Sequence, residues 1–262
     1  MSAASGNKRP GTAEVSIRNI SKSFVENAVD TAVLDDISLD VRKGEIVVLF
    51  GPNGCGKTTL FNLLAGITQR TSGAIAFSCD ADRVGSVFQD YRASLFPWRT
   101  LQANIQFGLE LASCPQETAR TKVEHYLTKF GLQASQHKYP YEVSGGMAQL
   151  TSLARTLVLD PEVLLLDEPF SSLDHSMAWR LLKELLGSVK ENGITCMLVS
   201  HDVDEAIFLA DRVLVLSPRP ARIIGEFPIS FAHRDRSIVA TETFFGYRDA
   251  ILHSFFSTMA HA

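Results

Sequence analysis

The sequence lacks any apolar run long enough to cross a membrane. A membrane-spanning helix needs about 20 consecutive, mostly apolar residues, and no hydrophobic run in the chain approaches that length. Residues 1–12 (MSAASGNKRPGT) contain two basic side chains and no apolar segment. We therefore interpret them as a flexible tail and not as a secretory signal. Any contact of this chain with a membrane is expected to be indirect.

An excess of positive charge is also missing. Among the 262 residues, 25 Lys and Arg stand against 29 Asp and Glu, which gives a formal net charge of −4. Proteins that bind nucleic acid normally present a basic surface. The composition therefore gives no reason to expect nucleic acid as a partner.

Cysteines with the spacing of a metal site are absent as well. Cys55, Cys79, Cys114 and Cys196 are scattered along the chain. We expect four reduced thiols in a cytosolic protein. No internal repeat is visible, which predicts a single copy of the functional module.

The composition that remains is that of a globular protein with a large core. Hydrophobic residues make up 45% of the chain and charged residues 21%. Residues 14–50 contain short apolar runs that predict strands, and residues 163–217 alternate strand-like and helix-like patterns, which favours a parallel sheet. Helices are expected at residues 116–130, where apolar side chains recur at helical spacing, and at about 175–191.

The clearest motif is GPNGCGKTTL at residues 51–60. It follows the apolar run EIVVLF and precedes a helix-like segment, so a strand, a glycine loop and a helix are predicted in succession. The glycines let successive backbone N–H groups point at one phosphate, and the helix start adds its positive dipole end. Lys57 supplies a mobile charge and Thr58 a hydroxyl for Mg²⁺. The motif predicts a bound nucleoside triphosphate.

Two acidic residues at the end of another apolar run narrow this prediction. In VLLLDEPF (163–170), Asp167 ends the expected strand and Glu168 follows it. The first carboxylate can hold Mg²⁺ together with Thr58, and the second can orient and polarise an attacking water. The alternative is a surface Asp–Glu pair after a core strand. Because a phosphate loop lies upstream, we favour the metal-binding and water-activating roles.

The segment VSGGM (143–147) predicts a second anion site, because Ser144 and two glycines stand at a helix start. One chain has one terminal phosphate to bind, so a second site suggests that it serves the nucleotide of another chain. In a head-to-tail dimer, each nucleotide would lie between the phosphate loop of one subunit and VSGGM of the other. An ordinary Ser-capped helix after a Gly-Gly loop is the alternative.

In this order, the motifs resemble those of the ATP-binding subunits of ABC transporters over residues 14–225. GPNGCGKTT is similar to the Walker A loop, LLLDEP to the Walker B strand and VSGGM to the signature. The resemblance implies that Phe24 stacks on adenine and that Asp174 in SSLD belongs to a loop crossing the dimer. It also implies that Gln89 in VFQD contacts Mg²⁺ and relays to a membrane partner, and that His201 in VSHD is a switch histidine at the γ-phosphate.

The motifs and the resemblance together give the expected site residues. Catalytic roles fall to Glu168, His201 and Gln89, and metal contacts to Thr58, Gln89 and Asp167. ATP and Mg²⁺ are the implied ligands, and ATP hydrolysis is the implied reaction. Nucleotide contacts are expected from Phe24, Gly51, Pro52, Asn53, Gly54, Cys55, Gly56, Lys57, Thr58, Thr59, Ser144, Gly145, Gly146 and Asp174.

The implied fold is α/β, a P-loop NTPase (RecA-like) core with a parallel sheet, an antiparallel β subdomain and a helical subdomain. We expect the ATPase domain at 13–225, its helical subdomain at about 91–158, and a helical C-terminal extension at 226–262. The apolar spacing of that extension favours packing on its own domain, with a dimer or membrane-surface contact as the alternative. The charged residues at 233–236 (HRDR) are expected to be solvated.

Two further segments, at residues 89–109 and 216–229, resemble importers of the nitrate, sulfonate and taurine type. This resemblance implies a second copy of the chain, membrane permease subunits and, indirectly, an extracytoplasmic solute-binding protein as partners. It also implies a peripheral position on the cytoplasmic face of the inner membrane. The permease and binding protein choose the solute, so this subunit does not reveal it. We interpret the apolar loop at 95–98 (LFPW) either as core packing or as a groove for the permease.

Some positions depart from the family pattern. Met147 stands where many ABC signatures have Gln, Leu150 replaces a usual arginine, and Ala148 replaces a basic or polar residue. The loss of charge could weaken a contact to a second copy or to the permease.

Two competing functions explain fewer motifs. A soluble ABC protein acting on ribosomes or DNA would carry two cassettes or long coiled coils. A small-molecule P-loop kinase leaves VSGGM, SSLD and His201 unexplained.

Overall fold

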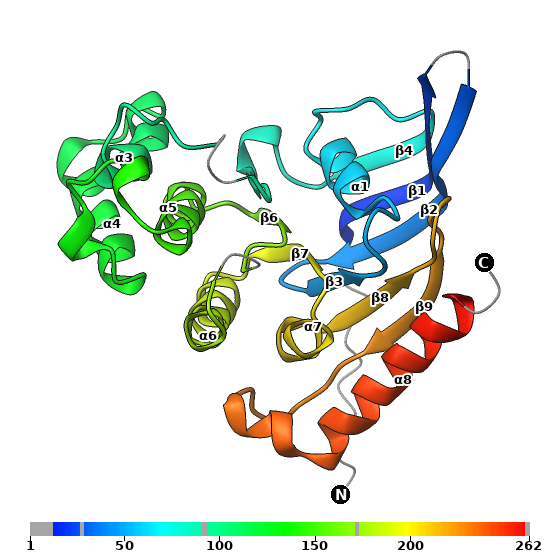
Figure 1. Cartoon of the computed structure of the whole chain (residues 1–262). Coiled ribbons are helices and arrows are strands. Elements are labelled where there is room, and N and C mark those ends of the chain that lie inside the picture. The colour runs from blue at the N-terminus through cyan, green and yellow to red at the C-terminus, as the bar shows by residue number, and fades with distance from the viewer. Residues whose placement is uncertain (1–12, 27–28, 91–93, 171–172, 260–262) are drawn as a thin grey trace, which may run out of the picture.

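The computed structural model describes residues 13–26, 29–90, 94–170 and 173–259. Figure 1 shows a central sheet with an antiparallel sheet on one side and a group of helices on the other. The long C-terminal helix runs along the lower edge of the central sheet in the same view.

The central sheet has six strands in the order β5-β6-β7-β3-β8-β9. The pairs from β5 to β8 are parallel, and β9 is antiparallel to β8. Because both faces are covered, every residue of β3, β6 and β7 is buried, as continuous apolar runs predict. The strands are β3 (Ile46–Phe50), β5 (Val84–Val87), β6 (Val163–Asp167), β7 (Thr195–Ser200), β8 (Arg212–Leu216) and β9 (Ile223–Pro228).

The smaller sheet is antiparallel, in the order β2-β1-β4. Its strands are β1 (Ala13–Glu26), β2 (Val29–Arg42) and β4 (Ser72–Phe77). From Ile37 to Arg42, buried and exposed residues alternate along β2, because one face of this sheet meets the core and the other meets solvent.

Helices cover the central sheet and extend it on one side. One face of the sheet packs on α1 and the antiparallel sheet, and the other face packs on α6, α7 and α8. Helices α3, α4 and α5 pack together beside the sheet (Figure 1). This arrangement confirms the predicted α/β fold class. The helices are α1 (Lys57–Leu64), α3 (Leu101–Leu111), α4 (Gln116–Lys129), α5 (Gly145–Leu157), α6 (His175–Glu191), α7 (Val203–Leu209) and α8 (Glu242–Met259), with short 3-10 turns at Ala81–Arg83, Gln133–Ser135, Pro140–Glu142 and Arg236–Ala240.

Helix α8 packs on the rest of the chain through its apolar face. Phe244 and Ile251 are buried, and the ring of Phe255 lies 5.2 Å from that of Phe50 at the end of β3. Arg248 pairs with Asp204 of α7 at 3.1 Å. The C-terminal helix therefore contacts the segment that follows the expected switch histidine.

The expectation that the HRDR residues are solvated is wrong for Arg234. Its guanidinium is mostly buried and donates hydrogen bonds to the carbonyls of Leu209 (2.5 Å) and Ala210 (2.6 Å), at the end of α7. Burial lowers the pKa of Arg234, and Asp211 opposes that shift. Arg234 satisfies carbonyls that a helix end leaves unpaired, so it anchors α7.

The apolar loop at 95–98 contains both a buried and an exposed side chain, so the interpretations as core packing and as a permease contact apply to different residues. Leu95 is buried in the core of the chain, whereas Trp98 is 72% exposed. Phe96 lies between them, with its ring 4.6 Å from that of Phe107 on α3. Within the described ranges, no helix is both long enough and apolar enough to span a membrane.

Candidate nucleotide-binding site

The glycine loop connects β3 to α1 and lies against β2. Gly54 (φ 74°) and Gly56 (φ 127°) adopt conformations that other residues rarely tolerate. A Cβ atom on Gly56 would also lie 2.9 Å from the side chain of Leu34. Gly56 offers no side-chain cap to α1, so the amides of the first turn remain for a ligand.

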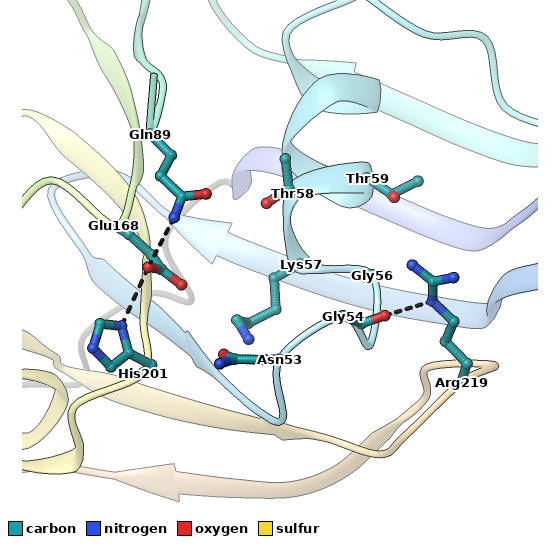
Figure 2. Close-up of a pocket in the computed structure, with 10 residues that line it drawn as sticks. All are labelled: Asn53, Gly54, Gly56, Lys57, Thr58, Thr59, Gln89, Glu168, His201 and Arg219. Atoms are coloured by element: carbon teal, nitrogen blue, oxygen red, sulfur yellow. Dashed lines mark hydrogen bonds and ion pairs between the residues drawn. The ribbon is translucent and has the colours of Figure 1, made fainter. Parts of the chain in front are cut away.

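Lys57 is folded back into this loop. Only 5% of the residue is exposed, and its ammonium donates to the carbonyls of Gly51 (2.8 Å) and Pro52 (3.0 Å). These hydrogen bonds hold the charge inside the curve of the loop (Figure 2), beside the uncapped amides of the first turn of α1. A polyphosphate would meet both kinds of donor at once.

Asp167 ends β6 with a buried carboxylate. Neither of its oxygens has a hydrogen-bond partner among the residues that the structure describes. Burial raises the pKa of Asp167, the Thr58 hydroxyl opposes that rise, and the charge of Glu168 adds to it. An unpaired buried carboxylate is costly unless it meets a cation, and hydroxyl and carboxylate oxygens are ligands that Mg²⁺ prefers. Thr58 and Asp167 therefore fit a magnesium ion.

Glu168 meets two side chains that come from other strand ends. Its Oε2 accepts a hydrogen bond from Gln89 Nε2 (3.3 Å) and lies 3.2 Å from His201 Nδ1. Gln89, Glu168 and His201 follow β5, β6 and β7, which are neighbours in the parallel sheet, so their side chains converge at one edge (Figure 2). Glu168 has a φ of 48°, and its N–H donates to the carbonyl of Val199. Such a strained backbone at a convergent polar cluster is typical of a functional site.

One cavity of about 330 Å³ joins the glycine loop to the cluster of Gln89, Glu168 and His201. Gln89, Glu168 and His201 lie on one side of Lys57, and Thr59 lies on the other (Figure 2). The cavity is lined by Asn53, Gly54, Gly56, Lys57, Thr58, Thr59, Gln89, Glu168, His201 and Arg219. The structure therefore brings most of the expected phosphate, metal and catalytic residues to one place.

The remaining expected contacts lie outside this cavity lining. Phe24 is on β1, 41% exposed, with the Lys22 ammonium 4.4 Å from the centre of its ring. Ser144 caps α5 and accepts from Met147 N at 3.4 Å, and Asp174 caps α6 in the same way. Gly146 packs so closely that an added Cβ would lie 2.4 Å from Leu173. Within one chain, Ser144 and Asp174 act as helix caps and Gly146 as a packing contact.

Comparison with known proteins identifies the family. The ABC transporter family matches residues 34–171, which is more than half of the 262 residues. An uncharacterized ABC transporter ATP-binding protein of Methanocaldococcus jannaschii is 39% identical over 246 residues, covering 91% of this chain and 90% of its own. The chain belongs to the ABC transporter family. It is an ATP-binding ATPase of that family, which confirms the predicted enzyme class.

Other members of the ABC transporter family are similarly close. The taurine import ATP-binding protein TauB of Roseobacter denitrificans is 40% identical over 225 residues, or 83% of each chain. TauB of Escherichia coli O157:H7 is 39% identical over 84% of this chain and 90% of its own.

Solved ABC cassettes share the fold. A cassette solved as a dimer in a post-hydrolysis state with ADP and Pi superposes with a TM-score of 0.75 at 23% identity, covering 83% of this chain and 99% of its own. CbiO1 of Clostridium perfringens, part of an ABC transporter complex, gives 0.72 at 26% identity, covering 92% and 96%.

Sequence reasoning missed three residues that the structure places at or beside the site. Arg219 lines the cavity, and Gln149 of α5 donates to the carbonyl of Glu168 at 3.3 Å. Glu205 of α7 accepts from Ser200 Oγ at 2.9 Å, and burial raises its pKa. Ser200 directly precedes His201, so Glu205 helps to fix the histidine loop. A polar residue on the buried face of a helix was the available signal for Gln149 and Glu205.

Two residues that depart from the ABC signature pattern, Ala148 and Leu150, lie on the buried face of α5. Their side chains pack inside this subunit and present no charge at its surface. The expected weakening of a contact to a second copy or to the permease stays a prediction.

Proposed function

We propose that this chain hydrolyses ATP to drive an importer of a small anion of the nitrate, sulfonate or taurine kind. The observation that carries the hydrolytic role is the contact of Glu168 with both Gln89 and His201 beside the Lys57 loop. The import role is supported by relatives named taurine import ATP-binding proteins, which match over more than four fifths of the chain.

In this proposal, the phosphate loop binds the ATP polyphosphate. Lys57 and the backbone amides of residues 51–59 hold the phosphates, with Phe24 under the adenine. Asp167, Thr58 and Gln89 hold Mg²⁺, which neutralises phosphate charge when bound. Asp167 is suited to this role because its buried oxygens otherwise lack partners within the described chain.

Glu168 then positions and polarises the attacking water. Its carboxylate is only 14% exposed and is fixed by Gln89 and His201, so it is oriented before a water arrives. His201 is 53% exposed in the chain, so its other ring nitrogen would contact the terminal phosphate while Nδ1 remains at Glu168. Gln89 joins this carboxylate to the end of β5.

We propose that a second copy completes each site. Ser144, Gly145, Gly146 and Asp174 lie outside the cavity lining of their own chain, which supports a role toward the nucleotide of a partner. A head-to-tail dimer would bring these helix starts to the terminal phosphate. The similar cassette solved as a dimer with ADP and Pi supports the presence of a second copy.

The remaining partners follow from the import role. Permease subunits would bind the helical side, where Trp98 is exposed, and a solute-binding protein would act through them. This places the chain peripherally on the cytoplasmic face of the membrane. We retain no role for nucleic acid.

Replacement of Glu168 by Gln tests the hydrolytic role. The amide keeps the shape but cannot accept a proton from water, so kcat for ATP should fall at least about 100-fold. ATP binding should persist, and size-exclusion chromatography with ATP should show a trapped dimer. The measurement is an ATPase assay of Glu168→Gln and of the matched control Glu162→Gln. Glu162 precedes β6 and pairs with Arg83. Hydrolysis at the wild-type rate in Glu168→Gln would show that the assigned role is wrong.

A further inference from the structure

The turn between β8 and β9 lies beside the phosphate loop. Strand β8 is the parallel neighbour of β3, with Leu214 opposite Leu49 and Val215 opposite Phe50. Both strands therefore end at the same edge of the sheet, and the residues that follow them meet there. Arg219 stands in this turn and lines the cavity that contains Lys57 and Thr59 (Figure 2).

Arg219 is oriented by the phosphate loop itself. Its Nε donates to the carbonyl of Gly54 at 2.5 Å. Within the described part of the chain, that carbonyl is the one hydrogen-bond partner found for this guanidinium. Figure 2 shows the two terminal nitrogens directed away from Gly54. An arginine held through Nε keeps its Nη donors for a planar or tetrahedral anion.

The turn is held in place by β2. Ala221 N donates to Val33 O at 2.9 Å, and Asp35 N donates to Ala221 O at 3.0 Å. The guanidinium of Arg222 also pairs with the carboxylate of Asp35. These contacts fix the backbone of the turn on β2. Little backbone entropy is therefore lost when Arg219 binds a ligand.

The position of Arg219 within the cavity indicates which part of a nucleotide it meets. Gln89, Glu168 and His201 lie on one side of Lys57, and Thr59 and Arg219 lie on the other (Figure 2). The phosphate that is hydrolysed must lie near Glu168. Arg219 therefore faces the opposite end of the polyphosphate, which ADP retains after hydrolysis.

We propose that Arg219 is a further nucleotide-binding residue, which donates from its Nη groups to the phosphate oxygens remote from Glu168. This inference rests on the proposed binding of ATP in the same cavity. Lys57, the other cation that lines the cavity within the described chain, already donates to two loop carbonyls. A second cation would balance the charge of the polyphosphate. Arg219 thus contributes to the affinity for ATP and ADP alike and takes no part in the chemical step.

Replacement of Arg219 by Gln separates phosphate binding from support of the loop. A glutamine amide can still donate to the Gly54 carbonyl but carries no charge. We expect Arg219→Gln to bind both ATP and ADP about tenfold more weakly, as loss of a charge-assisted hydrogen bond predicts. The KM for ATP should rise by a similar factor, and kcat should change little. Calorimetric titration with each nucleotide and steady-state ATPase assays give these values.

Arg222→Gln is the matched control. Arg222 belongs to the same turn, but it pairs with Asp35 and does not line the cavity. Arg222→Gln keeps the backbone hydrogen bonds that join Ala221 to Val33 and Asp35, so the turn stays in place and both nucleotides should bind with wild-type affinity at the same salt concentration. A weakening of ATP and ADP binding equal to that of Arg219→Gln would assign the effect to the turn as a whole and overturn the proposal.

Other outcomes also decide the question. Wild-type affinity in Arg219→Gln, with weaker binding only in Arg219→Ala, would show loop support alone and overturn the inference. Loss of ATP binding with ADP binding intact would place Arg219 at the hydrolysed end and likewise overturn it. If wild-type protein and Lys57→Ala both fail to bind nucleotide, the proposed function falls together with this inference. If only Lys57→Ala fails and Arg219→Gln binds normally, this inference alone is wrong.

Discussion

Two helices of this chain begin at a glycine-rich loop, but they offer different things to a ligand. Helix α1 follows Gly56, which gives its first turn no side-chain hydrogen bond. Helix α5 follows Ser144, whose hydroxyl already accepts from Met147 N at the long distance of 3.4 Å. The start of α1 has no side-chain cap and depends on a ligand to satisfy its amides, whereas the start of α5 already has one of its amides capped within the chain.

The two helix starts differ equally in the groups around them. The first is surrounded by Lys57, Asp167 and Glu168, whose charges are buried or nearly so. At the second, Gly146 packs against Leu173 of the segment that leads into α6. Of the two glycine-rich helix starts, the α1 start has convergent charged side chains of its own chain around it, which suits it to bind an anion there. The α5 start fits a role at the surface of another copy.

The largest expected effect comes from removal of the charge at α1. Lys57→Ala should weaken ATP and ADP binding about 100-fold or more, or about 3 kcal/mol, because a buried charge-assisted contact to phosphate is lost. Calorimetric titration measures this change. The control is Lys190→Ala, which removes an ammonium paired with Asp211 away from the cavity and should leave nucleotide affinity unchanged. Retained affinity in Lys57→Ala would contradict the assignment of the α1 start as the phosphate site.

A smaller effect on a different quantity is expected at α5. Ser144→Ala should leave ADP affinity unchanged but lower ATP hydrolysis about tenfold, because one hydrogen bond to the terminal phosphate of the partner's ATP is lost. ADP titration and ATPase assays separate the two quantities.

Mixing Ser144→Ala with Lys57→Ala then tests which chain each residue serves. In a head-to-tail dimer, each mixed pair has one intact site and one site with both defects. Random mixing makes half of the dimers mixed, so the rate should recover to about a quarter of wild type. A rate no higher than the mean of the two separate variants would indicate that both residues serve the nucleotide of their own chain.

The smallest expected effect concerns stability around α1. Burial raises the pKa of Asp167, so the folded chain holds this proton more tightly than the unfolded chain. The free energy of unfolding therefore falls as pH rises from the unfolded pKa through the folded one. Asp167→Asn should raise the free energy of unfolding of the nucleotide-free protein by about 1 kcal/mol at neutral pH and leave it unchanged at strongly acidic pH.

Urea unfolding followed by circular dichroism over a pH series measures this difference. Asp160→Asn, at an exposed carboxylate paired with Lys122, is the control and should show little change at any pH. An Asp167→Asn variant whose stability follows the wild-type pH profile would show that the carboxylate costs the fold nothing.

Local features of the fold were predictable because they depend on neighbouring residues in the chain. The predicted helix at about 175–191 is confirmed as α6, and Gly193 follows it with φ 64°, as a helix end favours. Ser144 caps α5, which is the alternative that the sequence offered for VSGGM. The apolar runs before Gly51 and Glu168 form the buried strands β3 and β6.

Contacts between distant segments were predictable only where a motif named them. The roles of Gln89 and His201 came from the family resemblance, because their distance from Glu168 along the sequence does not indicate that the side chains lie close together. Arg234 shows the limit most clearly, because a charged run reads as a solvated surface. Its guanidinium is buried because it bonds the carbonyls at the end of α7. The residues next to Arg234 in the sequence do not indicate that contact.

The sequence by itself determined the glycine loop, the strand that leads into it and the two acidic residues at the end of β6, Asp167 and Glu168. These features require only the backbone freedom of Gly54 and Gly56 and the order of a few side chains. The tertiary structure alone decided that Arg219 lines the same cavity as Lys57. The reason is the parallel pairing of β3 and β8, which are distant in sequence but end at one edge of the sheet. Strand order, which depends on how apolar faces are buried together, sets that proximity.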